Sequence, residues 1–197
     1  MMDVNVLIAG VGGQGVILAS DTLSEIGMNN GYDVKKSDTL GMAQRGGSVV
    51  SHVRWGERVF APLAKKGEID FLLGCEQLEA ARWASYLKPD GVALVADVIV
   101  VPTSIIGTDT AYPDFTEVER ILSQYTGKVY QLPANRIGIE TGNPRALNMV
   151  MLGALSVFLE LEEKAWIDCI SARLAPRFLE SSLKAFNMGA DEARAKK

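Results

Sequence analysis

A short apolar run that ends in a glycine-rich turn limits the folds open to this chain more than any other feature. Residues 4–9 are mostly branched apolar side chains, as in a buried strand. Residues 10–15 read G-V-G-G-Q-G, which matches G-x-G-x-x-G, and apolar residues then recur at helical spacing over residues 14–28. A strand, a glycine turn and a helix in this order predict the start of an α/β sheet.

The rest of the chain continues this pattern. A second strand at residues 32–36 would become the parallel neighbour of the first through a right-handed crossover. Four further strands are expected at residues 48–55, 69–73, 92–96 and 128–132, with a turn at 88–91. Helices are expected at residues 76–86, 115–125, 143–161, 164–174 and 176–187, followed by a charged, frayed tail from Gly189. The predicted fold is a Rossmann-like open sheet, mostly parallel, with helices on both faces and a helical C-terminal region, in a single domain of residues 1–197.

The predicted helix at residues 143–161 is apolar on nearly all sides. Such a helix must be enclosed by the sheet or by another subunit. An isolated chain with this surface is open to self-association.

The charged and cysteine residues exclude several classes of protein. The chain has 20 basic and 24 acidic side chains, so nucleic acid is not an expected ligand. No leader segment is evident, and the apolar stretch at 149–159 is too short for a bilayer, so we expect a cytoplasmic protein without a membrane partner. The two cysteines, Cys75 and Cys169, are too few and too far apart for a disulfide framework, a zinc site or an iron–sulfur cluster.

The glycine turn has two interpretations. Its glycines would let backbone N–H groups approach a phosphate, or they would only let the helix pack closely on the strand. A dinucleotide site also needs an acidic residue at the end of the second strand. Lys35 and Lys36 occupy that region, with Asp33 before them and Asp38 after them. This disfavours NAD and leaves an NADP-dependent oxidoreductase as an alternative.

Two stretches together resemble a known family. Residues 11–15 and residues 37–54, which read S-D-T-L-G-M-A-Q-R-G-G-S-V-V-S-H-V-R, resemble the gamma-type domain of the 2-oxoacid:ferredoxin oxidoreductases. They are most similar to the small subunits of members that act on indolepyruvate. Residues 148–155 also resemble a helical segment of that family, so the likeness covers almost the whole chain.

The resemblance implies a subunit of an enzyme complex that is not active alone. Such a complex oxidatively decarboxylates an aryl pyruvate with coenzyme A and passes the electrons to ferredoxin. Thiamine diphosphate, magnesium and iron–sulfur clusters would be held by a large alpha subunit as partner. The shortage of cysteines and the lack of an acidic G-D-G type segment in this chain agree with that division. Pyruvate, 2-oxoglutarate and branched-chain 2-oxoacids remain alternative substrates.

We hypothesise that the glycine turn and the following loop line one crevice at the carboxyl ends of parallel strands, facing coenzyme A or the partner's active site. Gln14 and Gln44 would supply amides, and Arg45 would supply a planar guanidinium for carboxylate or phosphate. Pairing of Arg45 with a partner carboxylate is an equal alternative, and a purely structural interaction module is a third view of the chain. The candidate binding residues are Gly10, Gly12, Gly13, Gln14, Gly15, Asp38, Gln44, Arg45, Gly46 and Gly47. We predict no catalytic residue and no metal ligand in this chain.

Other polar residues are expected to have structural roles. His52 is predicted to be a packed strand histidine, and Asp97 a turn or cap residue. Cys75 and Cys169 are expected to be small buried hydrophobes. The Lys35–Lys36 pair is expected at a solvated strand end.

Overall fold

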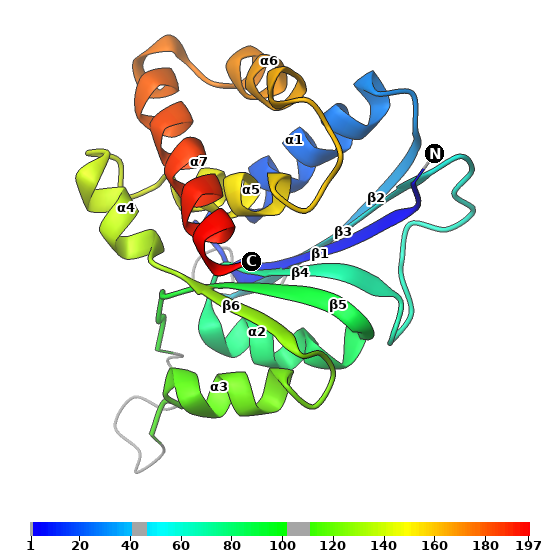
Figure 1. The fold of residues 1–197 in the computed structure, drawn as a ribbon, viewed down its shortest axis with the longest axis vertical. Helices are drawn as coiled ribbons and strands as arrows, with labels where there is room; N and C mark the ends of the chain where they lie inside the picture. Colours follow the sequence, from blue (N-terminus) through cyan, green and yellow to red (C-terminus); the bar gives the residue numbers. More distant parts are fainter. Residues whose placement is uncertain (1, 41–46, 102–110) are drawn as a thin grey trace.

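A six-stranded sheet runs through the middle of the molecule (Figure 1). The computed structural model describes residues 2–40, 47–101 and 111–197. The strand order is β2-β3-β1-β4-β5-β6, and the strands are β1 (Val4–Val11), β2 (Asp33–Leu40), β3 (Ser48–Gly56), β4 (Ile69–Gly74), β5 (Leu87–Ala96) and β6 (Lys128–Leu132). β1, β4, β5 and β6 pair in parallel, whereas β3 runs antiparallel to both of its neighbours. The predicted mostly parallel open sheet is confirmed.

The second strand is not the neighbour of the first, so that prediction was wrong. β3 lies between β1 and β2, and the register places Ser51 opposite Ile8 on one side and Asp38 on the other. The side chains of β3 fit an interior position in the sheet. Val53 and Trp55 alternate with their neighbours along the strand and are buried against α1 (Val16–Asn29). The crossover rule governs the direction of two strands and does not require that they touch.

β2 is also longer than predicted. Its ladder with β3 continues to the pair Leu40 and Val49, so Asp38 belongs to a strand and not to the expected loop. Gln44, Arg45 and Gly46 lie outside the described residues.

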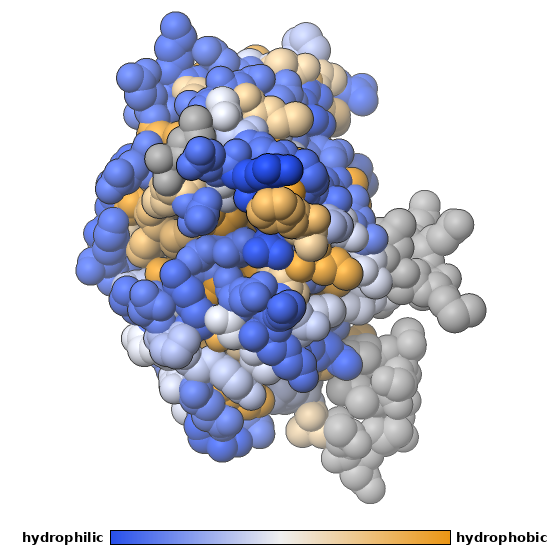
Figure 2. Space-filling model, turned by 90° about the vertical axis from the view of Figure 1, so that its right-hand side faces the viewer, coloured by the Kyte–Doolittle hydropathy of each residue, from blue (hydrophilic) through white to orange (hydrophobic). Residues whose placement is uncertain are grey.

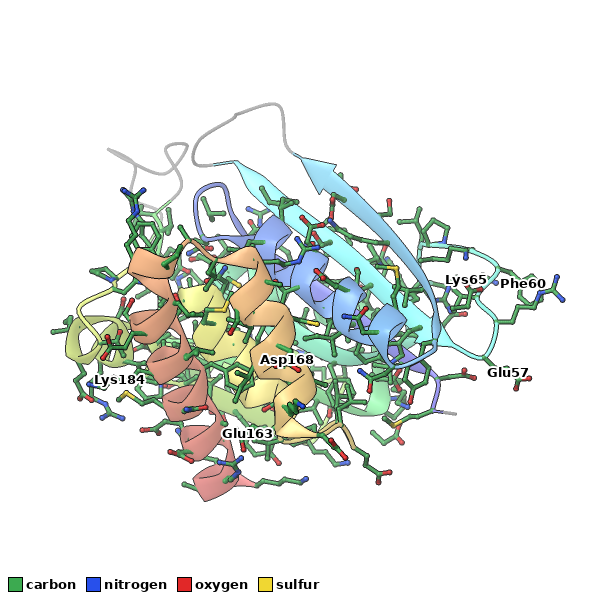
Figure 3. The ribbon with its side chains drawn as sticks, turned by 90° about the horizontal axis from the view of Figure 1, so that it is seen from above. Glu57, Phe60, Lys65, Glu163, Asp168 and Lys184 are labelled. Carbon is green, nitrogen blue, oxygen red and sulfur yellow. The ribbon has the colours of Figure 1, made fainter. Side chains whose placement is uncertain are left out.

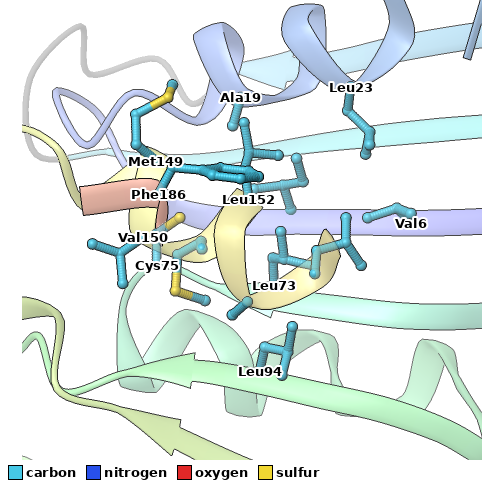
Figure 4. Close-up of a cluster of buried hydrophobic side chains, with 14 of the residues drawn as sticks. Val6, Ala19, Leu23, Leu73, Cys75, Leu94, Met149, Val150, Leu152 and Phe186 are labelled. Atoms are coloured by element: carbon cyan, nitrogen blue, oxygen red, sulfur yellow. The ribbon is translucent and has the colours of Figure 1, made fainter. Parts of the chain in front are cut away.

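Helices cover both faces of the sheet, as predicted (Figure 1). One face carries α2 (Gln77–Trp83), the short helix η1 (Ala84–Tyr86) and α3 (Phe115–Leu122). The other carries α1 together with α4 (Ala134–Glu140), α5 (Leu147–Ser156), α6 (Glu163–Arg173) and α7 (Pro176–Lys196). Figure 4 shows the core on this second face, in which Leu152 and Phe186 belong to the same buried cluster as the sheet residues Val6 and Leu73. The sequence patterns did not predict α4.

The C-terminal helices pack at unusually close range. A Cβ atom on Gly153 of α5 would lie 1.9 Å from the carbonyl oxygen of Phe186, and one on Gly189 would lie 2.2 Å from the carbonyl oxygen of Val150. α5 is therefore enclosed between the sheet and α7, as expected for a helix that is apolar all round. Because of this contact, α7 continues through Gly189 and ends at Lys196. The prediction of a frayed tail from Gly189 was therefore wrong.

The predicted turn at residues 88–91 was also wrong. These residues lie inside β5, where the register with β4 moves from the pair Ile69–Leu87 to the pair Phe71–Val92. The extra residues form an irregularity within the strand instead of ending it. Among the described residues, none of the helices has the length and apolar character needed to cross a membrane.

Candidate functional site

The glycine turn lies at the carboxyl edge of the sheet, where β1, β4 and β5 end. The side-chain oxygen of Gln14 accepts the backbone N–H of Val11 at 2.7 Å, and the Gln14 N–H donates to the Val11 carbonyl at 3.1 Å. Gly13 and Gly15 have positive φ angles of 105° and 78°, which favour glycine. The amide oxygen of Gln14 thus closes the turn on itself, and the predicted ligand contact would have to come from its amide nitrogen.

Both predicted glycine segments meet at this edge. The Gly12 N–H donates to the Gly47 carbonyl at 2.9 Å, which extends the β1–β3 ladder past its last pair, Val11 and Ser48. Gly10 lies below the turn, where an added Cβ would meet the side chains of Gln14 and Cys75. The structure therefore places Gly10, Gly12 and Gly47 in one region.

Asp38 does not join them. Its carboxylate accepts the Ser51 hydroxyl at 2.6 Å and pairs with Lys36 at 2.8 Å, on the face of the sheet that α1 covers. Lys36 also pairs with Asp21 of α1. Burial alone would lower the pKa of Lys36, but its hydrogen bonds to Asp21 and Asp38 outweigh burial and raise that pKa. Lys36 is thus a paired residue under α1, and its predicted place at a solvated strand end was wrong.

A pocket of about 240 Å³ opens beside the turn, between the starts of α1 and α5 and the first turns of α7. Asn148 is 4% exposed, and its amide nitrogen lies 3.4 Å from the Gly15 carbonyl. Arg145 also lines this pocket. The apolar part of the lining comes from Leu18, Met149, Leu174 and Phe178.

Of the residues that line this pocket, only Gly13 and Gly15 were predicted from the sequence as site residues. A signal was present, because Asn148 is a polar residue inside the otherwise apolar run of α5.

Two buried carboxylates, which were not predicted from the sequence, follow β4 at the same edge. Glu76 is 1% exposed and accepts the backbone N–H groups of Glu79 at 2.9 Å and Val100 at 3.1 Å. Glu79 accepts the hydroxyl of Ser48 at 2.5 Å and so ties α2 to the start of β3. Burial raises the pKa of Glu79, although the Ser48 hydrogen bond and the charge of Arg82 oppose the rise. Two acidic residues directly after a buried strand were the available signal.

Four other predictions are confirmed. His52 is 3% exposed and packs its ring against Trp83 and Tyr86, and burial, with a smaller effect of Arg54, lowers its pKa. Asp97 accepts the backbone N–H of Asn135 at 2.9 Å in the first turn of α4. Cys75 and Cys169 are buried, and burial raises the pKa of Cys75 to about 12.

Within residues 2–40, 47–101 and 111–197, no three His, Cys, Asp or Glu side chains gather in a way that could hold a metal ion.

Comparisons with known proteins agree with this geometry. The family model for pyruvate ferredoxin/flavodoxin oxidoreductase matches residues 5–192. Indolepyruvate oxidoreductase subunit IorB of Pyrococcus horikoshii is 32% identical over 197 residues, which cover 98% of each chain. The gamma subunit of a keto/oxoacid ferredoxin oxidoreductase from Geobacter sulfurreducens shares the fold, with a TM-score of 0.71, 24% identity and coverage of 98% of this chain and 99% of that one. A 2-oxoglutarate:ferredoxin oxidoreductase from Magnetococcus marinus gives a TM-score of 0.77 at 21% identity, over 100% of this chain and 32% of that one. The chain belongs to the pyruvate ferredoxin/flavodoxin oxidoreductase family.

Proposed function

We propose that this chain is the small subunit of a cytoplasmic complex that oxidatively decarboxylates indolepyruvate with coenzyme A and passes the electrons to ferredoxin. The observation that carries the proposal is the similarity to an indolepyruvate oxidoreductase subunit of matching length, with 98% of both chains covered. The second candidate is the same reaction on pyruvate, 2-oxoglutarate or a branched-chain 2-oxoacid, since the fold is shared with a 2-oxoglutarate enzyme.

The proposal assigns thiamine diphosphate, magnesium and the iron–sulfur clusters to a larger alpha subunit. The cysteines of this chain fit a cluster poorly, because both are buried and the Cys75 thiol is held protonated by its raised pKa. Thiamine diphosphate would supply the decarboxylation chemistry in the partner, and this chain would supply a surface to the shared site.

We further propose that this surface is the glycine turn with its neighbouring pocket, and that it faces coenzyme A or the partner's active site. Gly13 and Gly15 border the pocket, and the Arg145 guanidinium could pair there with a phosphate group. The Magnetococcus marinus structure holds coenzyme A, which makes this co-substrate the first ligand to test. The proposed site also keeps these residues of the two glycine segments: Gly10, Gly12, Gln14, Gln44, Arg45, Gly46 and Gly47. Asp38 is left out of the binding surface, because its carboxylate is engaged with Ser51 and Lys36.

The test begins with co-expression of the full chain and the larger subunit. The purified complex is assayed for reduction of an electron acceptor with indolepyruvate and with each of the alternative 2-oxoacids. A complex that prefers pyruvate, or no complex at all, would refute the indolepyruvate assignment.

Arg45→Ala then tests the loop, with Arg120→Ala on the exposed surface of α3 as the matched control. Arg45→Ala should raise the KM for coenzyme A about tenfold or more while the complex still assembles, because it removes a charge-assisted contact. An unchanged KM with normal assembly refutes the ligand contact, and loss of assembly would instead assign Arg45 to the interface.

An NADP-dependent enzyme is disfavoured by one ion pair and by the order of the strands. Asp38 and Lys36 are engaged with each other, and β3 separates their strand from the glycine turn. Titration of the isolated chain with NADPH should therefore show no saturable binding. A purely structural module would keep full activity when both glycine segments are changed and assembly survives.

A further inference from the structure

Residues 57–68 connect β3 to β4 at the edge of the sheet opposite the glycine turn. Phe60 is 83% exposed and Leu63 is 53% exposed. Figure 3 shows Phe60 pointing away from the body of the molecule, with Lys65 beside it. Large exposed apolar side chains that lie close together favour contact with a binding partner over contact with water.

The segment is held firmly behind these side chains. Arg54 donates to the Leu63 carbonyl at 2.9 Å and to the side-chain oxygen of Asn5 at 2.7 Å. The Asp33 carboxylate accepts the backbone N–H of Val59 at 2.8 Å. Because its backbone is already fixed, Phe60 would lose little conformational entropy when it binds a partner.

The charges around Phe60 show what kind of partner fits. The Arg58 guanidinium lies 4.9 Å from the centre of the Phe60 ring. Arg58, Lys65 and Lys66 are exposed, and none forms an ion pair with a described residue. A carboxylate oxygen of Glu68 lies 3.8 Å from the Arg54 guanidinium, so Glu68 faces Arg54. Glu57 is the second of the two acidic residues in the segment.

Within residues 57–68, the three exposed cations outnumber the two carboxylates, Glu57 and Glu68. Figure 2 faces this end of the molecule and shows apolar side chains between strongly hydrophilic ones. A second copy of the chain would bring cations against cations at this surface, whereas a partner with carboxylates would be attracted.

We propose that residues 57–68 are the docking segment for the larger subunit of the complex. Phe60 and Leu63 enter an apolar depression on that subunit, and carboxylates on its rim meet Arg58, Lys65 and Lys66. The inference rests on the proposed function, which supplies the larger subunit. It places an assembly contact at the amino edge of the sheet, in addition to the surface that the glycine turn presents to the shared site at the opposite edge.

The experiment measures the Kd between the full chain and the larger subunit. Phe60→Ala should weaken binding about tenfold or more, as truncation of a buried aromatic anchor does. Ile139→Ala is the matched control, because Ile139 is an apolar side chain that is 76% exposed on α4 at the other edge of the sheet. The Kd of this variant for the larger subunit should stay within about threefold of the wild-type value. Unfolding temperatures of the isolated variants check that both remain folded.

A triple variant, Arg58→Glu, Lys65→Glu and Lys66→Glu, tests the charge complementarity separately. Its loss of affinity should be larger at low salt than at high salt, because screening weakens exposed charge pairs. Wild-type affinity in both Phe60→Ala and the triple variant would overturn the docking segment and leave the proposed function intact. Failure of the wild-type chain itself to bind the larger subunit would overturn the proposed function.

Discussion

The backbone N–H of Gly12 donates to the carbonyl oxygen of Gly47 at 2.9 Å, and this hydrogen bond joins two glycine segments that are far apart in the sequence. It exists because β3 pairs antiparallel with β1 and brings its first residue, Ser48, opposite Val11. The loop before β3 therefore ends beside the glycine turn. A sheet in which β2 was the neighbour of β1 would have separated the two segments.

Substitution of Gly15 should destabilise the fold through a defined clash. A Cβ atom there would lie 2.7 Å from the side-chain nitrogen of Asn148, and the φ angle of 78° is already unfavourable for alanine. Gly31 has a similar φ of 82° but no atom within 4 Å, so Gly31→Ala isolates the backbone strain. In urea unfolding, we expect the unfolding free energy to fall by about 1 kcal/mol in Gly31→Ala and by about 3 kcal/mol in Gly15→Ala. Equal losses would show that Asn148 moves aside at no cost.

Two substitutions of Gln14 separate its structural role from ligand binding. Gln14→Ala leaves the Val11 N–H without its acceptor and should cost about 1–2 kcal/mol of unfolding free energy. Gln14→Glu keeps an acceptor oxygen for the Val11 N–H, replaces the amide nitrogen with a second oxygen and adds a negative charge. If Gln14 acts within the turn alone, the glutamate variant should keep the wild-type KM for coenzyme A in the complex. A raised KM in that variant would show that coenzyme A lies close to the end of the Gln14 side chain, because both the lost amide nitrogen and the added negative charge act there.

Much of the fold could be predicted because apolar periodicity reports burial. The runs that became β1, β4 and β6 and the helical pattern of α1 reflect side chains that face a core. The errors arose where contacts distant in sequence decide the outcome. The register shift between β4 and β5 keeps residues 88–91 in a strand, and the contact of Gly189 with Val150 keeps the last turns of α7 helical.

The candidate site was predictable only in part. The glycine turn has a local signature, so Gly13 and Gly15 were found from the sequence alone. Asp38 was placed in the wrong environment, because its contacts with Lys36 and Ser51 depend on the order of the strands. Arg145 reaches the pocket only through the packing of α5 and α7 against α1, which no local pattern records.

The contact between α5 and α7 should be among the least tolerant in the molecule. Gly153→Ala would place a methyl group 1.9 Å from the Phe186 carbonyl oxygen, and backbone atoms cannot rotate away as a side chain can. We expect the unfolding free energy of Gly153→Ala to be lower than that of wild type by about 3 kcal/mol or more. Gly127→Ala is the control, because nothing lies within 4 Å of its added Cβ, and its unfolding midpoint should stay close to wild type. A mild effect of Gly153→Ala would mean that the two helices can separate freely.

Glu79 should make the stability of the protein depend on pH. Burial raises its pKa in the folded state above the ordinary value of 4.5, so the folded protein binds this proton more tightly than the unfolded protein does. The contribution of Glu79 to the unfolding free energy is therefore greatest below pH 4.5, declines as the pH rises through the folded pKa, and stays low above it. Glu79→Gln carries no titrating proton and should lose less stability over that range.

Urea unfolding of wild type and Glu79→Gln at several pH values from about 4.5 to 7.5 measures this difference. Glu119→Gln, at an exposed carboxylate on α3, is the control and should follow the wild-type profile. Parallel profiles for wild type and Glu79→Gln would show that the Ser48 hydrogen bond and the charge of Arg82 already compensate for the burial of the carboxylate.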